Sequence, residues 1–177
     1  MHILIAGEIG IGKSTIINKL LQRVQQPVFG FCTEKTDGDA SGNTRVYIYP
    51  ASGEKAYSDE NTVGICTPEG AKVNIDVFNN LGVFLLTNIP IGSIVLMDEL
   101  GFMESNASAF CHAVIRILDG PYFVLAAVKV KNTYFLEKVR SHQDALVYGI
   151  TAGNRDTLYE QILLDLTRLD PTSPFLP

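Results

Sequence analysis

Residues 7–14 read Gly-Glu-Ile-Gly-Ile-Gly-Lys-Ser, and this stretch decides the fold. It matches the pattern G-x-x-x-x-G-K-[ST], in which a glycine-rich loop binds phosphate through its backbone N–H groups. Gly7, Gly10 and Gly12 are expected to supply the φ values and the close backbone approach that a phosphate needs. A chance match in a chain of 177 residues is on the order of 0.01. The stretch therefore predicts an anion site near the amino terminus.

The flanking sequence supports the same interpretation. An apolar run of strand length, 2–6, precedes the loop, and an amphipathic helical pattern follows it. The loop amides and the helix N-terminus then converge on one point of positive potential. Lys13 adds a charge for the β- and γ-phosphate oxygens, and Ser14 offers a hydroxyl to Mg²⁺. The predicted nucleotide-binding residues are Gly7, Glu8, Ile9, Gly10, Ile11, Gly12, Lys13, Ser14 and Thr15.

Apolar periodicity predicts the fold class. Short apolar runs without alternation indicate strands buried on both faces. Helical patterns with one apolar stripe lie between them, such as Ile17, Leu20, Leu21 and Val24. This alternation predicts an α/β fold with a doubly wound, mainly parallel sheet. The predicted strands lie at 2–6, 28–32, 94–97, 122–128 and 145–150.

The length indicates a single domain, 1–170, with a C-terminal tail, 171–177, expected as a surface extension. The stretch 33–72 interrupts the alternation, because it is rich in Gly, Ser, Asp and Asn. One alternating segment within it ends at Pro50, which predicts an inserted edge hairpin at about 36–68. A helix is expected over roughly 76–88.

The composition bears on whether the protein binds nucleic acid or membranes and on the cellular compartment in which we expect it. Lys+Arg 14 against Asp+Glu 19 gives a net charge of −5, which opposes binding to nucleic acid or to an anionic membrane. The basic stretch from Lys129 to Arg140 is interrupted by Glu137 and is interpreted as a solvated face. Three cysteines without a C-x-x-C pair favour a reducing compartment. We therefore expect a cytoplasmic protein with no nucleic-acid or membrane partner; the sequence identifies no protein partner.

A second motif, Ile94–Glu99, consists of four apolar residues followed by two carboxylates. In a doubly wound sheet the ligand lies at the carboxyl ends of the strands, so Asp98 is expected beside the phosphate loop. Ser14 and Asp98 are the predicted ligands of Mg²⁺. Glu99 is predicted to point elsewhere, with its carboxylate free to orient or deprotonate a water. Glu99 and Lys13 are thus the predicted catalytic residues.

The motifs together resemble the small nucleoside-triphosphatases called cancer-related or thermophilic-type NTPases. The phosphate loop, Gly30–Glu34, Asp98–Glu104 and Asn154–Asp156 occur in that family's order, over residues 2 to about 162. The resemblance implies a P-loop NTPase fold. It also implies Mg²⁺-dependent hydrolysis of nucleoside triphosphates to diphosphate and phosphate, with broad base tolerance.

Three positions depart from the family pattern. Ile9 stands where proline is common, and Ser14 stands where threonine is usual. The two hydroxyls are equivalent toward Mg²⁺. Asp37 occupies a place where an arginine often follows the Gly-Phe-x-Thr-Glu segment.

Two strand-end residues and one acidic residue are weaker candidates. Thr33 and Glu34 are expected to leave their strand on the side of the phosphate loop, where they could hold water or a nucleotide group; a polar turn is the alternative. Glu104 precedes Ser105 and Asn106, which are expected to cap the helix at 107–118, so a structural role is expected for this segment.

The last loop and the basic stretch contribute further candidates. Asn154 is expected to cap the final helix, with Asp156 in its first turn. Arg155 is left to stack on the base or to stabilise transferred charge. Arg140 or Lys131 could act as a charge-stabilising finger, and the sequence does not choose between them.

Other functions that use the same loop remain to be weighed. A nucleotide or nucleoside kinase needs arginines for a phosphorylated acceptor, but the segment 33–62 contains only Arg45. Transfer to a small neutral acceptor stays open, with Glu99 as its base. A GTPase switch would need an N-K-x-D segment to bind guanine. This chain has none at the expected place, where residues 129–134 read K-V-K-N-T-Y. A regulatory nucleotide with slow hydrolysis also stays open.

Overall fold

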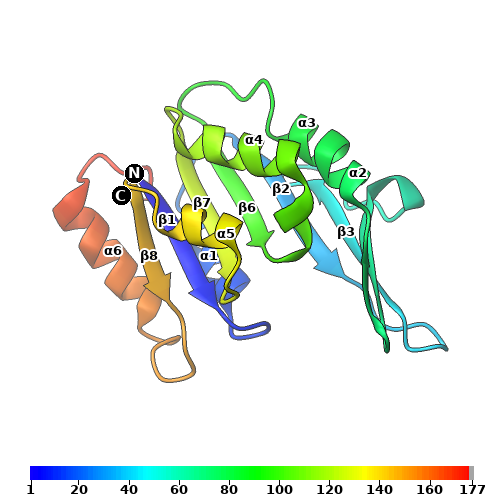
Figure 1. Ribbon diagram of the computed structural model, residues 1–177. Coiled ribbons are helices and arrows are strands. Elements are labelled where there is room, and N and C mark those ends of the chain that lie inside the picture. The colour runs from blue at the N-terminus through cyan, green and yellow to red at the C-terminus, as the bar shows by residue number, and fades with distance from the viewer. Residues whose placement is uncertain (176–177) are drawn as a thin grey trace.

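The computed structural model describes residues 1–175, which form one eight-stranded sheet (Figure 1). The strand order is β5-β4-β3-β2-β6-β7-β1-β8. Neighbours from β2 to β8 are parallel, and β3, β4 and β5 continue the sheet in antiparallel pairing. The strands are β1 (His2–Gly7), β2 (Val28–Lys35), β3 (Thr44–Pro50), β4 (Thr62–Thr67), β5 (Gly70–Val73), β6 (Ile94–Leu100), β7 (Phe123–Lys129) and β8 (Ala145–Gly149).

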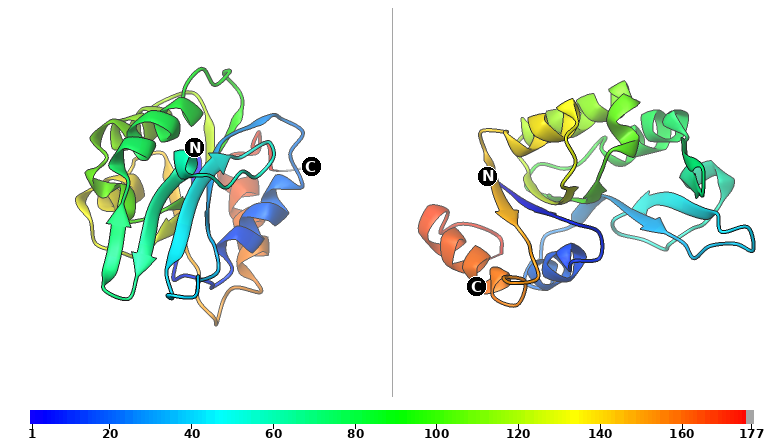
Figure 2. Two further views of the ribbon diagram at one scale, coloured as in Figure 1. Left: turned by 90° about the vertical axis from the view of Figure 1, so that its right-hand side faces the viewer. Right: turned by 60° about the horizontal axis from the view of Figure 1, so that its bottom comes forward.

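Helices cover both faces of the parallel part of the sheet (Figures 1 and 2). One face packs against α1 and α6, and the other packs against α4, α5 and the helical segment that follows the antiparallel strands. This arrangement confirms the predicted doubly wound α/β fold. The helices are α1 (Lys13–Leu21), α2 (Ile75–Val77), α3 (Val83–Leu85), α4 (Ser108–Leu118), α5 (Tyr134–Arg140) and α6 (Leu158–Leu169), with a π-helix at Phe78–Gly82 and 3₁₀ turns at Asp59–Asn61 and Met103–Asn106.

Alternate residues of each central strand enter two separate apolar clusters. Leu4 packs in the cluster that contains Phe110 of α4. Its neighbour Ile5 packs in the cluster that contains Ile17 of α1 and Ile162 of α6. Because successive side chains of a strand point to opposite faces, a strand covered on both sides must be apolar throughout. This explains the unbroken apolar runs in the sequence.

The insertion after β2 is larger than a single hairpin. The alternating segment forms β3, and the chain then returns through β4 and β5 to make the edge of the sheet. The predicted helix over 76–88 is present over 75–85, with a π-helical turn, 78–82, between α2 and α3. The insertion therefore widens the sheet beside β2.

The expectation that the tail is a surface extension is wrong for the residues described. Phe175 is only 1% exposed and packs in the same cluster as Ile162 and Leu166. Arg23, just after α1, donates from Nε to the Phe175 carbonyl at 2.7 Å. Burial of the large apolar ring of Phe175 stabilises the docked tail, although the tail is rich in proline. Residues 176–177 lie outside the described residues.

The helices are short or carry polar faces. Within residues 1–175, none of them combines the length and the hydropathy that crossing a membrane requires.

His2 is a buried titratable group at the end of the sheet opposite the phosphate loop. Its Nε2 lies 2.8 Å from the Leu118 carbonyl, and its Nδ1 lies 3.3 Å from the Val124 amide. Since an amide only donates and a carbonyl only accepts, His2 carries its proton on Nε2 and is neutral. Burial lowers the pKa of His2, and the Leu118 contact opposes this effect. The N-terminal amine and His142 lower the same pKa further, and Asp144 raises it.

We expect the free energy of unfolding to decrease as the pH falls below 6.5, the ordinary histidine pKa. The unfolded chain takes up a proton at His2 that the folded chain resists, which costs up to about 1.4 kcal/mol per pH unit. Thermal unfolding of the wild type and of His2→Asn, from about pH 8 to about pH 5, measures this contribution. The variant should show the flatter profile, and two parallel profiles would contradict the prediction.

Candidate functional site

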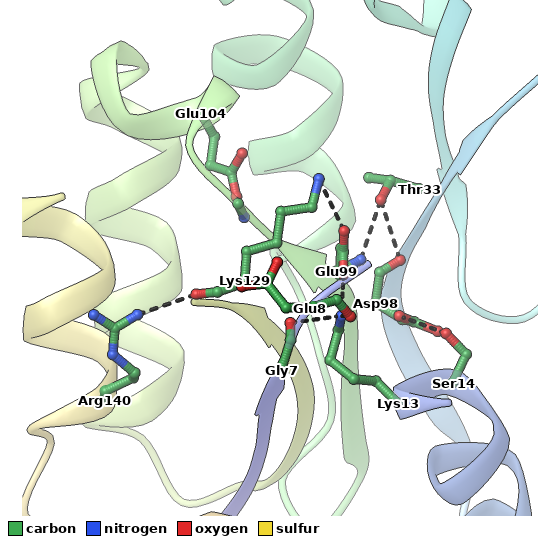
Figure 3. A network of polar contacts seen from close by, with 11 residues as sticks. Gly7, Glu8, Lys13, Ser14, Thr33, Asp98, Glu99, Glu104, Lys129 and Arg140 are labelled. Carbon is green, nitrogen blue, oxygen red and sulfur yellow. Dashed lines mark hydrogen bonds and ion pairs between the residues drawn. The ribbon is translucent and has the colours of Figure 1, made fainter. Parts of the chain in front are cut away.

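The carboxyl ends of β1, β6 and β7 meet at one edge of the sheet and form a cleft of about 560 Å³ (Figure 3). From the phosphate loop, Ile9, Gly10 and residues 12–15 line this cleft. Thr33 of β2 and Asp98 and Glu99 of β6 line it as well, so the two sequence motifs face each other across one space. Its volume suits a small-molecule ligand.

The glycines of the phosphate loop are needed for different physical reasons. Gly10 (φ 73°) and Gly12 (φ 113°) adopt left-handed backbone conformations that other residues rarely tolerate. Gly7 is required by packing, since a Cβ there would lie 2.4 Å from Cγ2 of Ile150. Gly12 caps α1 without a side-chain hydrogen bond, so the first-turn amides are available to an anion.

Lys13 is folded back onto its own loop and is only 5% exposed. Its Nζ donates to the carbonyls of Gly7 at 2.9 Å and Glu8 at 2.7 Å. It also lies 3.1 Å from Oε2 of Glu99. These three oxygens satisfy the buried ammonium, as a buried charge requires. A phosphate oxygen that binds Lys13 must therefore replace some of them.

Ser14 and Asp98 meet as predicted, although β7 lies between β1 and β6 in the sheet. Ser14 donates from Oγ to Oδ1 of Asp98 at 3.2 Å (Figure 3). Burial raises the pKa of Asp98, and the Ser14 hydrogen bond opposes this effect. Within residues 1–175 Asp98 has no ion-pair partner, so no protein cation neutralises this largely buried carboxylate.

This pair suits Mg²⁺ by its chemistry. Both donors are hard oxygen atoms, and Mg²⁺ is usually bound by one or two protein groups together with substrate phosphates. Among the described residues, no cluster of three His, Cys, Asp or Glu side chains forms a complete metal site. The donor set thus fits an ion that completes its shell with phosphate oxygens and water.

Glu99 lies in the cleft, but the expectation that its carboxylate is free is wrong. Oε2 pairs with Lys13, and Oε1 lies 2.9 Å from Nζ of Lys129. Thr33 holds the adjacent backbone: its Oγ1 accepts from the Glu99 amide at 3.1 Å and donates to the Asp98 carbonyl at 3.4 Å. Thr33 therefore positions the two carboxylate residues through their main chain.

Lys129 is a site residue that sequence reasoning missed; Lys35 of β2 also lines the cleft and was missed as well. The basic stretch that contains Lys129 is interpreted from sequence as a solvated face, but the Lys129 side chain is only 20% exposed. It is the last residue of β7 and pairs in register with Gly7 of β1. The rule that placed Asp98 at the ligand edge also applies to the end of β7 and could have found Lys129.

Glu34 does not face the cleft, so its predicted placement is wrong. Its Oε2 accepts from Lys55 at 2.7 Å and from the Tyr49 hydroxyl at 2.9 Å. The Lys55 hydrogen bond is the main reason why the pKa of Glu34 is lowered. Adjacent residues in a strand point to opposite faces, so Thr33 and Glu34 could not both reach the phosphate side.

Asn154 forms hydrogen bonds within the loop after β8 and does not cap helix α6. Asn154 Oδ1 accepts from the Thr151 amide at 2.8 Å, and its Nδ2 donates to the Gly149 carbonyl at 2.8 Å. Helix α6 begins only at Leu158, so the expected cap and first turn are wrong. Arg155 lies on this loop with its side chain 55% exposed, outside the cleft lining.

The side chains of Arg140 and Glu104 have structural partners, whereas Lys131 is exposed and contributes only its carbonyl. Arg140 donates to the carbonyls of Lys129 at 3.1 Å and Lys131 at 3.2 Å, which secures the chain after β7. Glu104 is buried and accepts a hydrogen bond from the Gly101 amide. Burial raises the pKa of Glu104 to about 7. Ala107 precedes α4 without a side-chain cap, so the capping expected from Ser105 and Asn106 is wrong.

Comparisons with known proteins identify the family of this chain. Residues 2–163 match the model of a family described as NTPase. Nucleoside-triphosphatase THEP1 of Thermotoga sp. (strain RQ2) is 30% identical over 169 residues, covering 92% of this chain and 94% of that protein. The cancer-related nucleoside-triphosphatase of Homo sapiens is 26% identical over 182 residues, covering 92% and 94%.

A solved structure supports the fold as well. The crystal structure of THEP1 from the hyperthermophile Aquifex aeolicus matches with a TM-score of 0.72 at 25% identity, and the match covers 94% of this chain and 99% of that one. With a family model that spans most of the sequence and with the phosphate loop and paired carboxylates in one cleft, this chain belongs to the NTPase family of small P-loop nucleoside-triphosphatases.

Proposed function

We propose that this protein hydrolyses nucleoside triphosphates to nucleoside diphosphate and phosphate, in a Mg²⁺-dependent reaction that accepts ATP, GTP, CTP and UTP. The supporting observation is that the phosphate loop, the Ser14–Asp98 pair and Glu99 share one cleft. The relatives named nucleoside-triphosphatases point to the same reaction.

The phosphates are bound by backbone and by one ammonium. Amides of the loop and of the first turn of α1 point at the β- and γ-phosphates, where the helix dipole favours negative charge. Lys13 leaves the Gly7 and Glu8 carbonyls and binds phosphate oxygens instead. None of these groups reads the base, which supports broad base tolerance.

Ser14 and Asp98 are the residues that would hold Mg²⁺, which neutralises charge on the phosphate oxygens during transfer. Glu99 orients the attacking water and accepts its proton. The water oxygen bonds to the γ-phosphorus while the bond to the β–γ bridging oxygen breaks, and the nucleoside diphosphate leaves. Catalysis comes mainly from positioning and charge stabilisation.

Phosphate release from each of the four nucleoside triphosphates tests the proposed reaction. Rates should agree within roughly tenfold, or ~1.4 kcal/mol in activation free energy, because the binding groups contact phosphates and not the base. The same assay with added nucleosides or monophosphates should give no phosphorylated acceptor. Phosphate transfer to an acceptor, with little release to water, would instead support a kinase.

Glu99→Gln should reduce phosphate release by roughly 10²–10⁴-fold, because the amide cannot accept a proton from water. Nucleotide binding, measured by calorimetry, should be retained. Glu137→Gln is the matched control, since this carboxylate is exposed on α5. Unchanged turnover in Glu99→Gln would remove Glu99 from the mechanism.

Removal of Mg²⁺ with EDTA should abolish phosphate release, and Asp98→Asn should raise the Mg²⁺ concentration for half-maximal activity by roughly 10–100-fold. Because the pKa of Asp98 is raised, the proton competes with the metal, so the wild type needs more Mg²⁺ as the pH falls. Asp156→Asn, at an exposed carboxylate, is the control. Equal Mg²⁺ dependence in all three proteins would contradict the assignment.

A further inference from the structure

Glu99 lies between two ammonium groups that come from distant parts of the chain. Lys13 contacts Oε2 at 3.1 Å, and Lys129 contacts Oε1 at 2.9 Å (Figure 3). The two lysines differ in their other partners. Lys13 is shared with the loop carbonyls of Gly7 and Glu8, whereas Lys129 makes its one ion pair among the described residues with Glu99.

A bound triphosphate changes this balance. Phosphate oxygens compete for Lys13, because that lysine belongs to the phosphate loop. The same phosphates bring negative charge close to the Glu99 carboxylate, and like charges at such distances repel strongly where water is scarce. The Glu99 side chain is 20% exposed, so solvent screens it only in part. The proposed Mg²⁺ would offset part of the phosphate charge, and Lys129 is the ammonium group that still contacts the carboxylate when Lys13 is engaged by phosphate.

Lys129 is built to be that cation. Arg140 fixes its backbone by a hydrogen bond of 3.1 Å to the Lys129 carbonyl. The aliphatic part of the Lys129 side chain passes Gly101. A Cβ at Gly101 would lie 3.1 Å from Lys129 Cδ, so a glycine there leaves room for the lysine. Its Nζ lies 5.8 Å from the centre of the Phe102 ring, within range of a cation–π contact. Lys129 thus reaches Glu99 with little conformational freedom left to lose.

We propose that Lys129 is a positioning residue, which holds the Glu99 carboxylate against the attacking water after a triphosphate has drawn Lys13 away. The inference rests on the proposed function, since that function gives Glu99 its role. Lys129 needs no contact with the γ-phosphate for this. The Glu99 backbone is held separately by Thr33, so Lys129 acts on the side chain alone.

Steady-state hydrolysis of Mg²⁺–ATP by three variants tests the role of Lys129. Lys129→Met should lower kcat by roughly 10–100-fold and leave KM within about threefold, because substrate binding does not use this lysine. Lys129→Arg keeps the cation and should recover most of the lost kcat. Lys138→Met removes an exposed lysine from the same basic stretch and should match the wild type.

A double-mutant cycle with Glu99→Gln shows whether Lys129 acts through Glu99. Adding Lys129→Met to Glu99→Gln should lower kcat by less than about threefold further, since the two residues act together and Glu99→Gln has already removed their joint contribution. A raised KM with unchanged kcat would make Lys129 a phosphate anchor and overturn the proposal. Additive losses in the double variant, or an unaltered Lys129→Met, would also overturn it.

Folding and function are separated by two further measurements. Thermal unfolding shows whether each variant is folded. If Lys129→Met does not fold, comparing kcat of Lys129→Arg with kcat of Lys129→Gln tests the need for a cation, because only arginine keeps the charge. A wild type that releases no phosphate, or a fully active Glu99→Gln, removes the proposed function and the role of Lys129 with it. Normal dependence on Glu99 without dependence on Lys129 removes only the latter.

Discussion

The pairing of the buried Lys13 ammonium is the interaction on which the site depends. A charge taken out of water must find oxygen partners, and Lys13 finds them in two loop carbonyls and in Glu99. Glu99 in turn binds Lys129, so one chain of alternating charges joins the loop after β1 to the ends of β6 and β7. Thr33 secures the same three-strand junction through the backbone of β6.

The sequence was sufficient for those parts of the structure that local pattern determines. Unbroken apolar runs identified the five parallel strands, and the central strands β1, β6 and β7 need them because they are covered on both faces. The edge strand β8 is partly exposed although its run is also apolar. The glycine-lysine-serine loop and the Asp98–Glu99 pair were placed at one sheet edge by the chain-direction rule for α/β folds, and Ser14 does meet Asp98 there. The assignment of roles to these residues remains a prediction.

The sequence was insufficient where a side chain has several candidate partners. Asn154, Ser105 and Asn106 are good helix caps by type, but Asn154 bonds within its own loop and Ala107 precedes α4. The strand-end rule could have placed Lys129 in the cleft, but its ion pair with Glu99 joins two different strands, and no local pattern records that contact. The burial of Phe175 likewise depends on α1 and α6, which lie far away in sequence.

The folded-back position of Lys13 gives its ammonium group three oxygen partners within the protein. Two carbonyls and a carboxylate of the same molecule contact this ammonium, so an anion that binds it must displace partners that cannot diffuse away. A ligand with a single phosphate offers few oxygens for that exchange, whereas a polyphosphate offers many at once. Displacing the intramolecular partners of Lys13 is therefore part of the free-energy cost of binding any phosphate oxygen to this lysine.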